Sequence, residues 1–183
     1  MSKVWLVTGP PGVGKSTLIS RVVFRLKGTG VMVGGCLTSE MREKGVRVGF
    51  AVVNLTDGGR GELASATSHL GPRVGRYRVN LKDLASVGAA GLQRASESSE
   101  VIVIDEVGPM ELVSPEFRRA LKACIESGKP ILAVVHPRLD DDLLTELKEK
   151  AEEIVTLSLD NQDSVGDYIA AKILAAVGGP KTS

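Results

Sequence analysis

Residues 9–16, with the sequence GPPGVGKS, constrain the fold more than any other segment of the chain. They match the pattern GxxxxGK[ST] in full, and the apolar run at residues 4–7 precedes them where a strand would lead into the loop. In such a loop, glycines let backbone N–H groups turn towards phosphate oxygens, a lysine supplies a cation and a serine hydroxyl can bind Mg²⁺. We therefore expect a phosphate-binding P-loop rather than a chance Gly/Pro turn, followed by a helix over residues 17–27 whose positive end adds to the anion site. The residues expected to bind phosphate are Gly9, Pro10, Pro11, Gly12, Val13, Gly14, Lys15, Ser16 and Thr17.

Downstream of this loop, apolar runs typical of strands alternate with segments of helical periodicity. The expected strands cover residues 31–37, 101–104, 130–135 and 154–159, and the expected helices cover residues 81–97, a segment beginning at Ser114-Pro115, 143–151 and 165–173. This alternation predicts an α/β P-loop NTPase fold with a mainly parallel sheet flanked by helices on both faces. Residues 45–79 instead predict a small antiparallel extension, because two extended stretches there flank the turn signal TDGG at residues 56–59.

The size and the net charge of the chain restrict the class of protein to which it can belong. With 183 residues and 43% hydrophobic content it can bury one sizeable core, so we expect a single domain over residues 1–178 and a short tail over residues 179–183. Lys and Arg total 23 against 22 Asp and Glu, and this balance gives no reason to expect a nucleic-acid surface.

The hydrophobic segments and the cysteines indicate the cellular location of the protein. No segment approaches the roughly 20 apolar residues of a membrane span, and the N-terminal apolar stretch leads into the P-loop rather than to a cleavage site. We therefore expect a cytoplasmic protein without a membrane partner, and we favour a monomer. Cys36 and Cys124 lie far apart with no CxxC or Cys/His cluster, so we expect small buried hydrophobic residues rather than a disulfide or zinc ligands.

Two adjacent carboxylates follow the apolar run at residues 101–104. Asp105 stands where a Walker B aspartate would hold Mg²⁺ together with Ser16, commonly through a water shell. Glu106 could orient and deprotonate a water that attacks the γ-phosphate, or it could simply face solvent. Glu111 belongs to the loop after the same strand, where open α/β sheets bind ligands, and is either a further site carboxylate or a helix-entry residue.

His136 and a group of arginines complete the candidates. His136 ends the strand after the Asp105 strand, which would place its imidazole beside the γ-phosphate, although a structural histidine is the alternative. An arginine of the middle segment could fold over the nucleotide and neutralise transition-state charge, or remain on the surface. The arginines considered are Arg42, Arg47, Arg73 and Arg76. The candidate catalytic residues are Lys15, Glu106, Glu111, His136 and Arg42, and the candidate metal ligands are Ser16 and Asp105.

Three segments resemble those of a known family. They are the P-loop with Thr17, the stretch GGCLTSEMREKGVRVGF at residues 34–50, and DEVGPMEL at residues 105–112. Together they resemble the thermophilic and cancer-related nucleoside-triphosphatase family, once also described as nucleotide kinases, because ExRExGxRxGF joined to DE(I/V)GxMEL is far more specific than a P-loop alone. The resemblance extends over nearly the whole chain. It implies a Mg²⁺-dependent hydrolase that converts nucleoside triphosphates such as ATP and GTP to the diphosphate and phosphate, slowly and with broad base specificity.

Three functions are compatible with these residues. Hydrolysis of nucleoside triphosphates is favoured, because an activated water is the natural partner of Glu106. A nucleoside or nucleotide kinase is the main alternative, since kinases also use a P-loop and a mobile arginine-bearing segment. A nucleotide-dependent switch or RNA-binding module ranks third, because 3% aromatic residues and a near-neutral charge provide no base-stacking surface.

Overall fold

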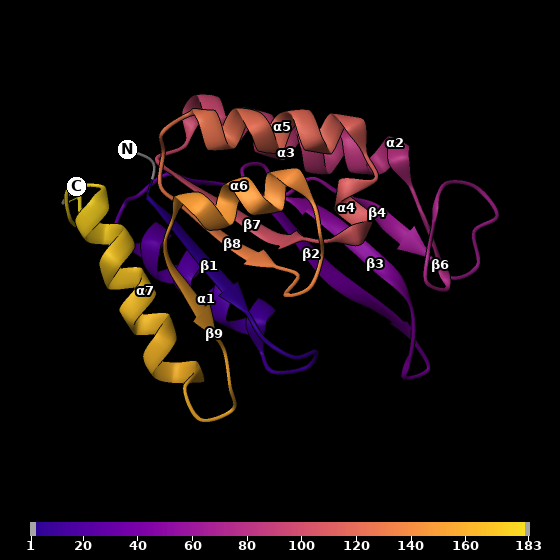
Figure 1. Cartoon of the computed structure of the whole chain (residues 1–183), viewed down its shortest axis with the longest axis horizontal. Coiled ribbons are helices and arrows are strands. Elements are labelled where there is room, and N and C mark those ends of the chain that lie inside the picture. The colour runs from indigo at the N-terminus through magenta and orange to yellow at the C-terminus, as the bar shows by residue number, and fades with distance from the viewer. Residues whose placement is uncertain (1–2, 182–183) are drawn as a thin grey trace.

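Nine strands form one sheet, in the order β5-β6-β4-β3-β2-β7-β8-β1-β9, in the computed structural model, which describes residues 3–181 (Figure 1). Five neighbouring strands are parallel: β2 (Val33–Glu43), β7 (Val101–Val107), β8 (Ile131–Val135), β1 (Val4–Thr8) and β9 (Ala151–Thr156). Four antiparallel strands extend the sheet beyond β2: β3 (Val46–Asn54), β4 (Arg60–Ser65), β6 (Tyr77–Val79) and β5 (Arg73–Val74). Because parallel strands end at the same edge, the carboxyl ends of β1, β7 and β8 meet beside the P-loop.

Helices cover both faces of this sheet (Figure 1). One face is covered by α1 (Lys15–Gly28) and α7 (Gln162–Ala176). The other is covered by α2 (Leu81–Asp83), the π-helical segment η1 (Leu84–Ala89), α3 (Ala90–Ser98), α5 (Pro115–Glu126) and α6 (Asp142–Lys150). Two-sided burial explains why the central strands are apolar throughout: Val4 and Leu6 of β1 face one core, and Trp5 and Val7 face the other. The predicted parallel sheet with helices on both faces and an antiparallel extension is confirmed.

Three strands differ in extent from those predicted. The strand predicted over residues 101–104 is β7, which continues to Val107. β2 continues to Glu43 instead of ending at residue 37, because its polar second half pairs with β3 rather than with an apolar core. A two-residue turn joins β2 and β3, and its residues Lys44 and Gly45 have φ of 49° and 78°, as tight hairpins require. β9 covers Ala151–Thr156 rather than residues 154–159, because its residues pair with β1 although alternate side chains face solvent.

Other expectations concern the cysteines and the chain end. Cys36 and Cys124 are buried, as predicted. Within residues 3–181, none of the helices combines the length and apolarity needed to cross a bilayer. The predicted tail covers residues 179–183, of which residues 182 and 183 lie outside the described residues. Within the tail, the N–H of Lys181 donates to the Thr29 carbonyl at 2.9 Å.

Candidate active site

The loop between β1 and α1 has the backbone of a phosphate cradle. Gly12 and Gly14 have φ of 77° and 96°, in the left-handed region that other residues adopt only under strain. Gly14 is the N-cap of α1, and no side chain of the described residues caps that helix end. Gln162 of α7 donates to the Val13 carbonyl at 2.6 Å and so holds the loop against α7. The first N–H groups of α1 are therefore available to an anion.

Lys15 is held by the same loop. Its Nζ donates to the carbonyl oxygens of Gly9 at 2.6 Å and Pro10 at 3.1 Å. Both acceptors are neutral carbonyl oxygens, whereas a phosphate oxygen carries negative charge and attracts the ammonium more strongly. Lys15 can therefore exchange these carbonyls for a phosphate.

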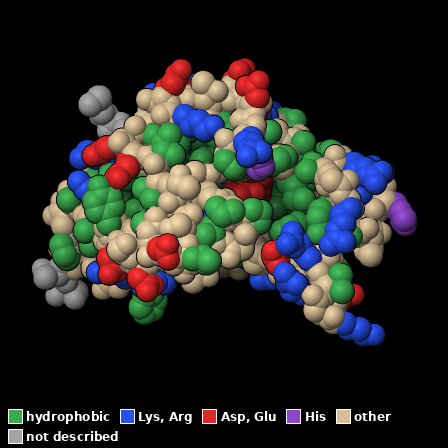
Figure 2. All heavy atoms as spheres, turned by 60° about the horizontal axis from the view of Figure 1, so that its bottom comes forward, with side chains coloured by type: hydrophobic (Ala, Val, Ile, Leu, Met, Phe, Trp, Pro, Cys, Tyr) green, Lys and Arg blue, Asp and Glu red, His purple; other side chains and the backbone are tan. Residues whose placement is uncertain are grey.

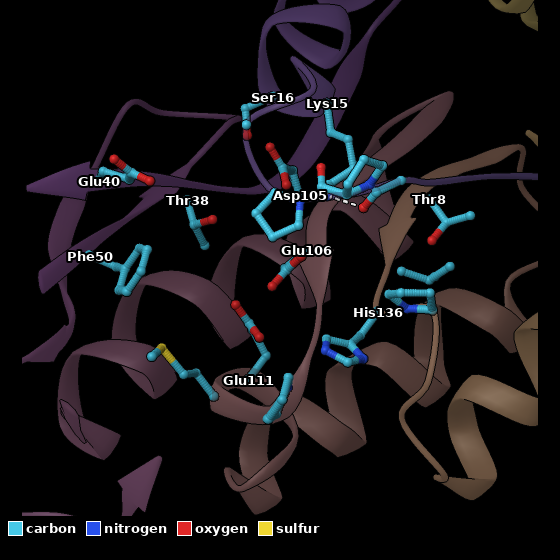
Figure 3. A pocket seen from close by; sticks show the side chains of 18 of the residues that line it. Thr8, Lys15, Ser16, Thr38, Glu40, Phe50, Asp105, Glu106, Glu111 and His136 are labelled. Carbon is cyan, nitrogen blue, oxygen red and sulfur yellow. Dashed lines mark hydrogen bonds between the residues drawn. The ribbon is translucent and has the colours of Figure 1, made fainter. Parts of the chain in front are cut away.

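Asp105 is buried within β7 and faces the Ser16 hydroxyl (Figure 3). Burial raises the pKa of Asp105 from 3.8 to about 6, although the Ser16 hydroxyl favours the charged form. Mg²⁺ prefers oxygen ligands, and a hydroxyl and a carboxylate beside a phosphate cradle are a donor set that fits it. Among the described residues, no three His, Cys, Asp or Glu side chains form a group able to hold a metal. Phosphate oxygens and water would have to complete the coordination shell.

Two further carboxylates, Glu106 and Glu111, lie in the cleft beyond Asp105 (Figure 3). Burial raises the pKa of Glu106, and the Lys15 ammonium opposes this effect. Glu111 is only 3% exposed and accepts the N–H of Gly108 at 3.1 Å, an interaction that begins the short helix α4 (Pro109–Leu112) where a loop was predicted. Burial, reinforced by the nearby Glu106 carboxylate, raises the pKa of Glu111 well above its ordinary value. The two groups therefore hold a proton more readily than exposed carboxylates do.

His136 follows β8, and its ring lies across the cleft from Glu111 (Figure 3). The backbone N–H of Arg138 donates to Nδ1 of His136 at 3.3 Å. A neutral imidazole that accepts at Nδ1 carries its proton on Nε2. His136 can therefore donate a hydrogen bond to a group in the cleft.

The β2–β3 hairpin forms the opposite side of the cleft. Both Arg42 and Arg47 line it, and both pair with Glu40, at 2.8 Å and 3.3 Å respectively. The pairing of the strands explains this cluster, since Glu40 lies opposite Phe50 and Arg42 lies opposite Arg47. The Arg47 guanidinium also lies 5.5 Å from the centroid of the Phe50 ring. The hairpin thus brings two cations and one anion to the site.

All these groups open into one cleft of about 870 Å³, a volume typical of small-molecule sites. Figure 2 shows the hollow with acidic side chains at its floor and hydrophobic side chains on one side. The predicted residues that it brings together are Gly9, Pro10, Pro11, Gly12, Lys15, Ser16, Arg42, Asp105, Glu106, Glu111 and His136. Arg73 and Arg76 are not among its described lining residues, and Arg76 instead donates to the Arg47 carbonyl at 2.7 Å. Val13, Gly14 and Thr17 can contribute through their backbone, since none of their side chains lines the described cleft.

The sequence prediction missed several lining residues. They are Thr8, Thr38, Ser39, Glu40, Phe50, Arg138 and Thr156. Thr8, Arg138 and Thr156 lie at or just after the carboxyl ends of parallel strands, so the rule that located His136 could have found them. Glu40 and Phe50 could not be placed, because their position depends on the register of a hairpin whose first strand was predicted too short.

Comparisons with known proteins agree with this geometry. Residues 4–170 match the family model described as NTPase. The chain is 40% identical over 178 residues to the nucleoside-triphosphatase THEP1 of Thermofilum pendens, which covers 96% of this chain and 98% of that protein. The structure of this chain is similar to a crystal structure of THEP1 from the hyperthermophile Aquifex aeolicus, with a TM-score of 0.80 and 26% identity. The match covers 93% of this chain and 98% of the Aquifex aeolicus chain. The structure is also similar to a solution structure of a human cancer-related nucleoside triphosphatase, with a TM-score of 0.79, 34% identity and coverage of 96% and 99%.

The fold and the cleft define an α/β protein of the P-loop NTPase class. Within that class, the chain belongs to the NTPase family whose model covers residues 4–170. The family resemblance found in the three sequence segments is thereby confirmed.

Proposed function

We propose that this chain is a Mg²⁺-dependent nucleoside-triphosphatase that converts nucleoside 5′-triphosphates, ATP and GTP included, to the diphosphate and phosphate with broad base specificity. The observation that carries the proposal is the meeting of the Lys15 loop with Asp105 and Glu106 in one cleft. The relatives that cover nearly the whole chain are named nucleoside-triphosphatases, which supports it further.

In this proposal the P-loop binds the substrate through its phosphates. Backbone N–H groups of residues 12–17 and the Lys15 ammonium contact the β- and γ-phosphates, where negative charge develops during the reaction. Ser16 and Asp105 would hold Mg²⁺, which when bound supplies a Lewis acid to the phosphate oxygens. Arg42 exchanges Glu40 for a γ-phosphate oxygen and neutralises part of its charge.

Glu106 is the proposed general base. Its raised pKa makes it a better proton acceptor near neutral pH than an exposed glutamate, because general-base efficiency increases as the pKa approaches the working pH. Glu111 lies beyond Glu106 and can share the proton taken from the attacking water. His136, with its proton on Nε2, can donate to that water or to the γ-phosphate and so fix the direction of attack.

A nucleoside or nucleotide kinase is not favoured, because the relatives are named for triphosphate hydrolysis and Glu106 suits a water nucleophile. We place the activity in the cytoplasm, where both substrates and Mg²⁺ are abundant and buried free thiols such as Cys36 remain reduced. We favour a monomer as the active unit, since the Lys15 loop, Asp105 and Glu106 meet in the cleft of a single chain.

Phosphate release from ATP, GTP, CTP and UTP tests the proposal, with and without added nucleosides or nucleoside monophosphates. Hydrolysis predicts Mg²⁺-dependent phosphate release from several of the four substrates at rates that do not depend on an acceptor. Diphosphate formation that requires an acceptor, with phosphate recovered on that acceptor, would contradict it.

A further inference from the structure

The cleft continues past the phosphate-binding loop into a half with a different lining. This half is formed by the antiparallel strands and by α4, and we call it the distal pocket. Its apolar residues are Phe50, Leu63, Val74, Pro109 and Met110. In Figure 3, Glu106 and Glu111 lie between Phe50 on one side and His136 on the other. The distal pocket therefore lies next to the position proposed for the attacking water, on the side away from His136.

A triphosphate bound to the P-loop leaves the distal pocket free. The γ-phosphate must lie towards Asp105 and Glu106, so the α-phosphate, sugar and base extend in the opposite direction from the loop. In the sheet, β1 lies between β8 and β9, whereas β3 and β4 lie on the far side of β7. The base is thus directed towards β9 and the distal pocket towards β3 and β4.

The apolar wall of the distal pocket is closely packed. Leu63 is 1% exposed, and the Phe50 ring packs edge-to-face against Tyr77 with centroids 5.2 Å apart. At Gly49 a Cβ would lie 2.3 Å from the Ala64 carbonyl oxygen, so β3 and β4 approach too closely there for a larger residue. A water molecule that attacks a γ-phosphate needs no such concave apolar surface, whereas small-molecule sites are typically built this way.

Arg47 gives this wall a charged group with unused hydrogen-bonding capacity. Its guanidinium stacks near Phe50 and pairs with Glu40, but its Nε is buried without a hydrogen-bond partner among residues 3–181. A planar guanidinium beside an aromatic ring suits a ligand that stacks through a flat ring and accepts through an anionic oxygen. Arg42, the second cation at this rim, is assigned to the γ-phosphate in the proposed function, so Arg47 is the cation left to bind an anionic group in the distal pocket.

We propose that the distal pocket is a second small-molecule site, which binds a flat apolar molecule carrying one anionic group while Mg²⁺-NTP occupies the P-loop. The inference rests on the proposed function, because that function sets the direction of the bound nucleotide. Phe50 and Met110 provide the apolar contact, and Arg47 binds the anionic group.

The dye 8-anilinonaphthalene-1-sulfonate combines aromatic rings with one anionic group and fluoresces in apolar surroundings, so it is a suitable probe. It is titrated into the full chain in the presence of Mg²⁺ and a saturating non-hydrolysable ATP analogue. We expect saturable binding of a single dye molecule per chain, and we expect this binding to persist in the presence of the analogue. Phe50→Ala should weaken dye binding about tenfold, and Arg47→Gln should weaken it severalfold. Phe24→Ala is the control, since Phe24 is 80% exposed on α1 and should leave dye binding unchanged.

Three results would overturn the inference: displacement of the dye by the analogue, no saturable binding, or equal effects of the Phe50 and Phe24 substitutions. Met110→Glu serves if Phe50→Ala does not fold, because it puts a negative charge in the wall without removing the contact between Phe50 and Tyr77. If Met110→Glu binds the dye with the affinity of the parent, this result would also overturn the inference. Phosphate release by the parent protein without dye tests the proposed function separately, so a protein that hydrolyses NTP but binds no dye would refute the second site alone.

Discussion

Replacing Asp105 with asparagine should stabilise the metal-free protein near neutral pH. In the folded chain, burial raises the pKa of Asp105 from 3.8 to about 6. Between these two values the folded state binds more protons than the unfolded state, so the free energy of unfolding falls as the pH rises through this window and stays low above it. At about 1.4 kcal/mol per pH unit, the loss amounts to about 3 kcal/mol. Asparagine keeps the size without the charge, and the altered contact with Ser16 reduces the expected gain to about 1–3 kcal/mol.

Urea unfolding of both proteins in EDTA, between pH 4 and pH 7.5, measures this effect. At pH 4 the two proteins should have nearly the same free energy of unfolding. At pH 7.5 the free energy of unfolding of Asp105→Asn should exceed that of the parent by the full expected gain. Adding Mg²⁺ with a non-hydrolysable NTP should reverse the order, because the ionised parent binds the metal better. Asp160→Asn, which changes an exposed carboxylate, should show a small difference at every pH. A difference for Asp105→Asn that does not change with pH would refute the reasoning.

The remaining predictions concern the loop and the hairpin. Lys15→Ala should lose most phosphate release while melting within a few degrees of the parent, because the hydrogen bonds of Lys15 go to two carbonyls of an exposed loop. Near-parent turnover by the folded variant would contradict this prediction. Glu40→Gln should tighten Mg²⁺-NTP binding about two- to fivefold in an equilibrium titration, since Arg42 no longer has to leave an exposed ion pair worth at most about 1 kcal/mol. Glu43→Gln on the same hairpin is its control, and equal effects of the two changes would count against the exchange. Hydrogen exchange of residues 40–50 should slow when a non-hydrolysable NTP and Mg²⁺ are added, whereas unchanged exchange at saturation would show that the hairpin does not close.

The phosphate-binding side of the cleft could be predicted because its determinants are local. The P-loop pattern specifies the turn between β1 and α1 within a few residues, and Asp105 and Glu106 directly follow the apolar run at residues 101–104 within β7. Parallel strands end at the same edge of the sheet, so His136 could be placed near these groups without knowledge of strand order.

The other side of the cleft depends on pairing between distant segments. The second half of β2 is polar and shows no strand-like apolar run, so the position of Arg42 and Glu40 follows only from the register with β3. The same holds for the apolar wall, where Phe50 of β3 meets Tyr77 of β6 through a strand order that no local pattern encodes. The burial of Glu111 depends on the turn of helix at Pro109–Leu112, which is too short to show periodicity in the sequence.

Single-turnover hydrolysis by Glu106→Gln tests most directly whether this cleft activates water for attack on a nucleoside triphosphate. The variant keeps the size and shape of the side chain but removes the proton acceptor, so it should bind Mg²⁺-NTP with nearly the affinity of the parent. Its hydrolysis rate should fall about a hundredfold or more, and raising Mg²⁺ should not restore it, whereas the defect of Asp105→Asn should ease. A Glu106→Gln protein that binds and hydrolyses Mg²⁺-NTP at nearly the parent rate would contradict the assignment of Glu106 as the base and would transfer that role to Glu111, His136 or the substrate itself.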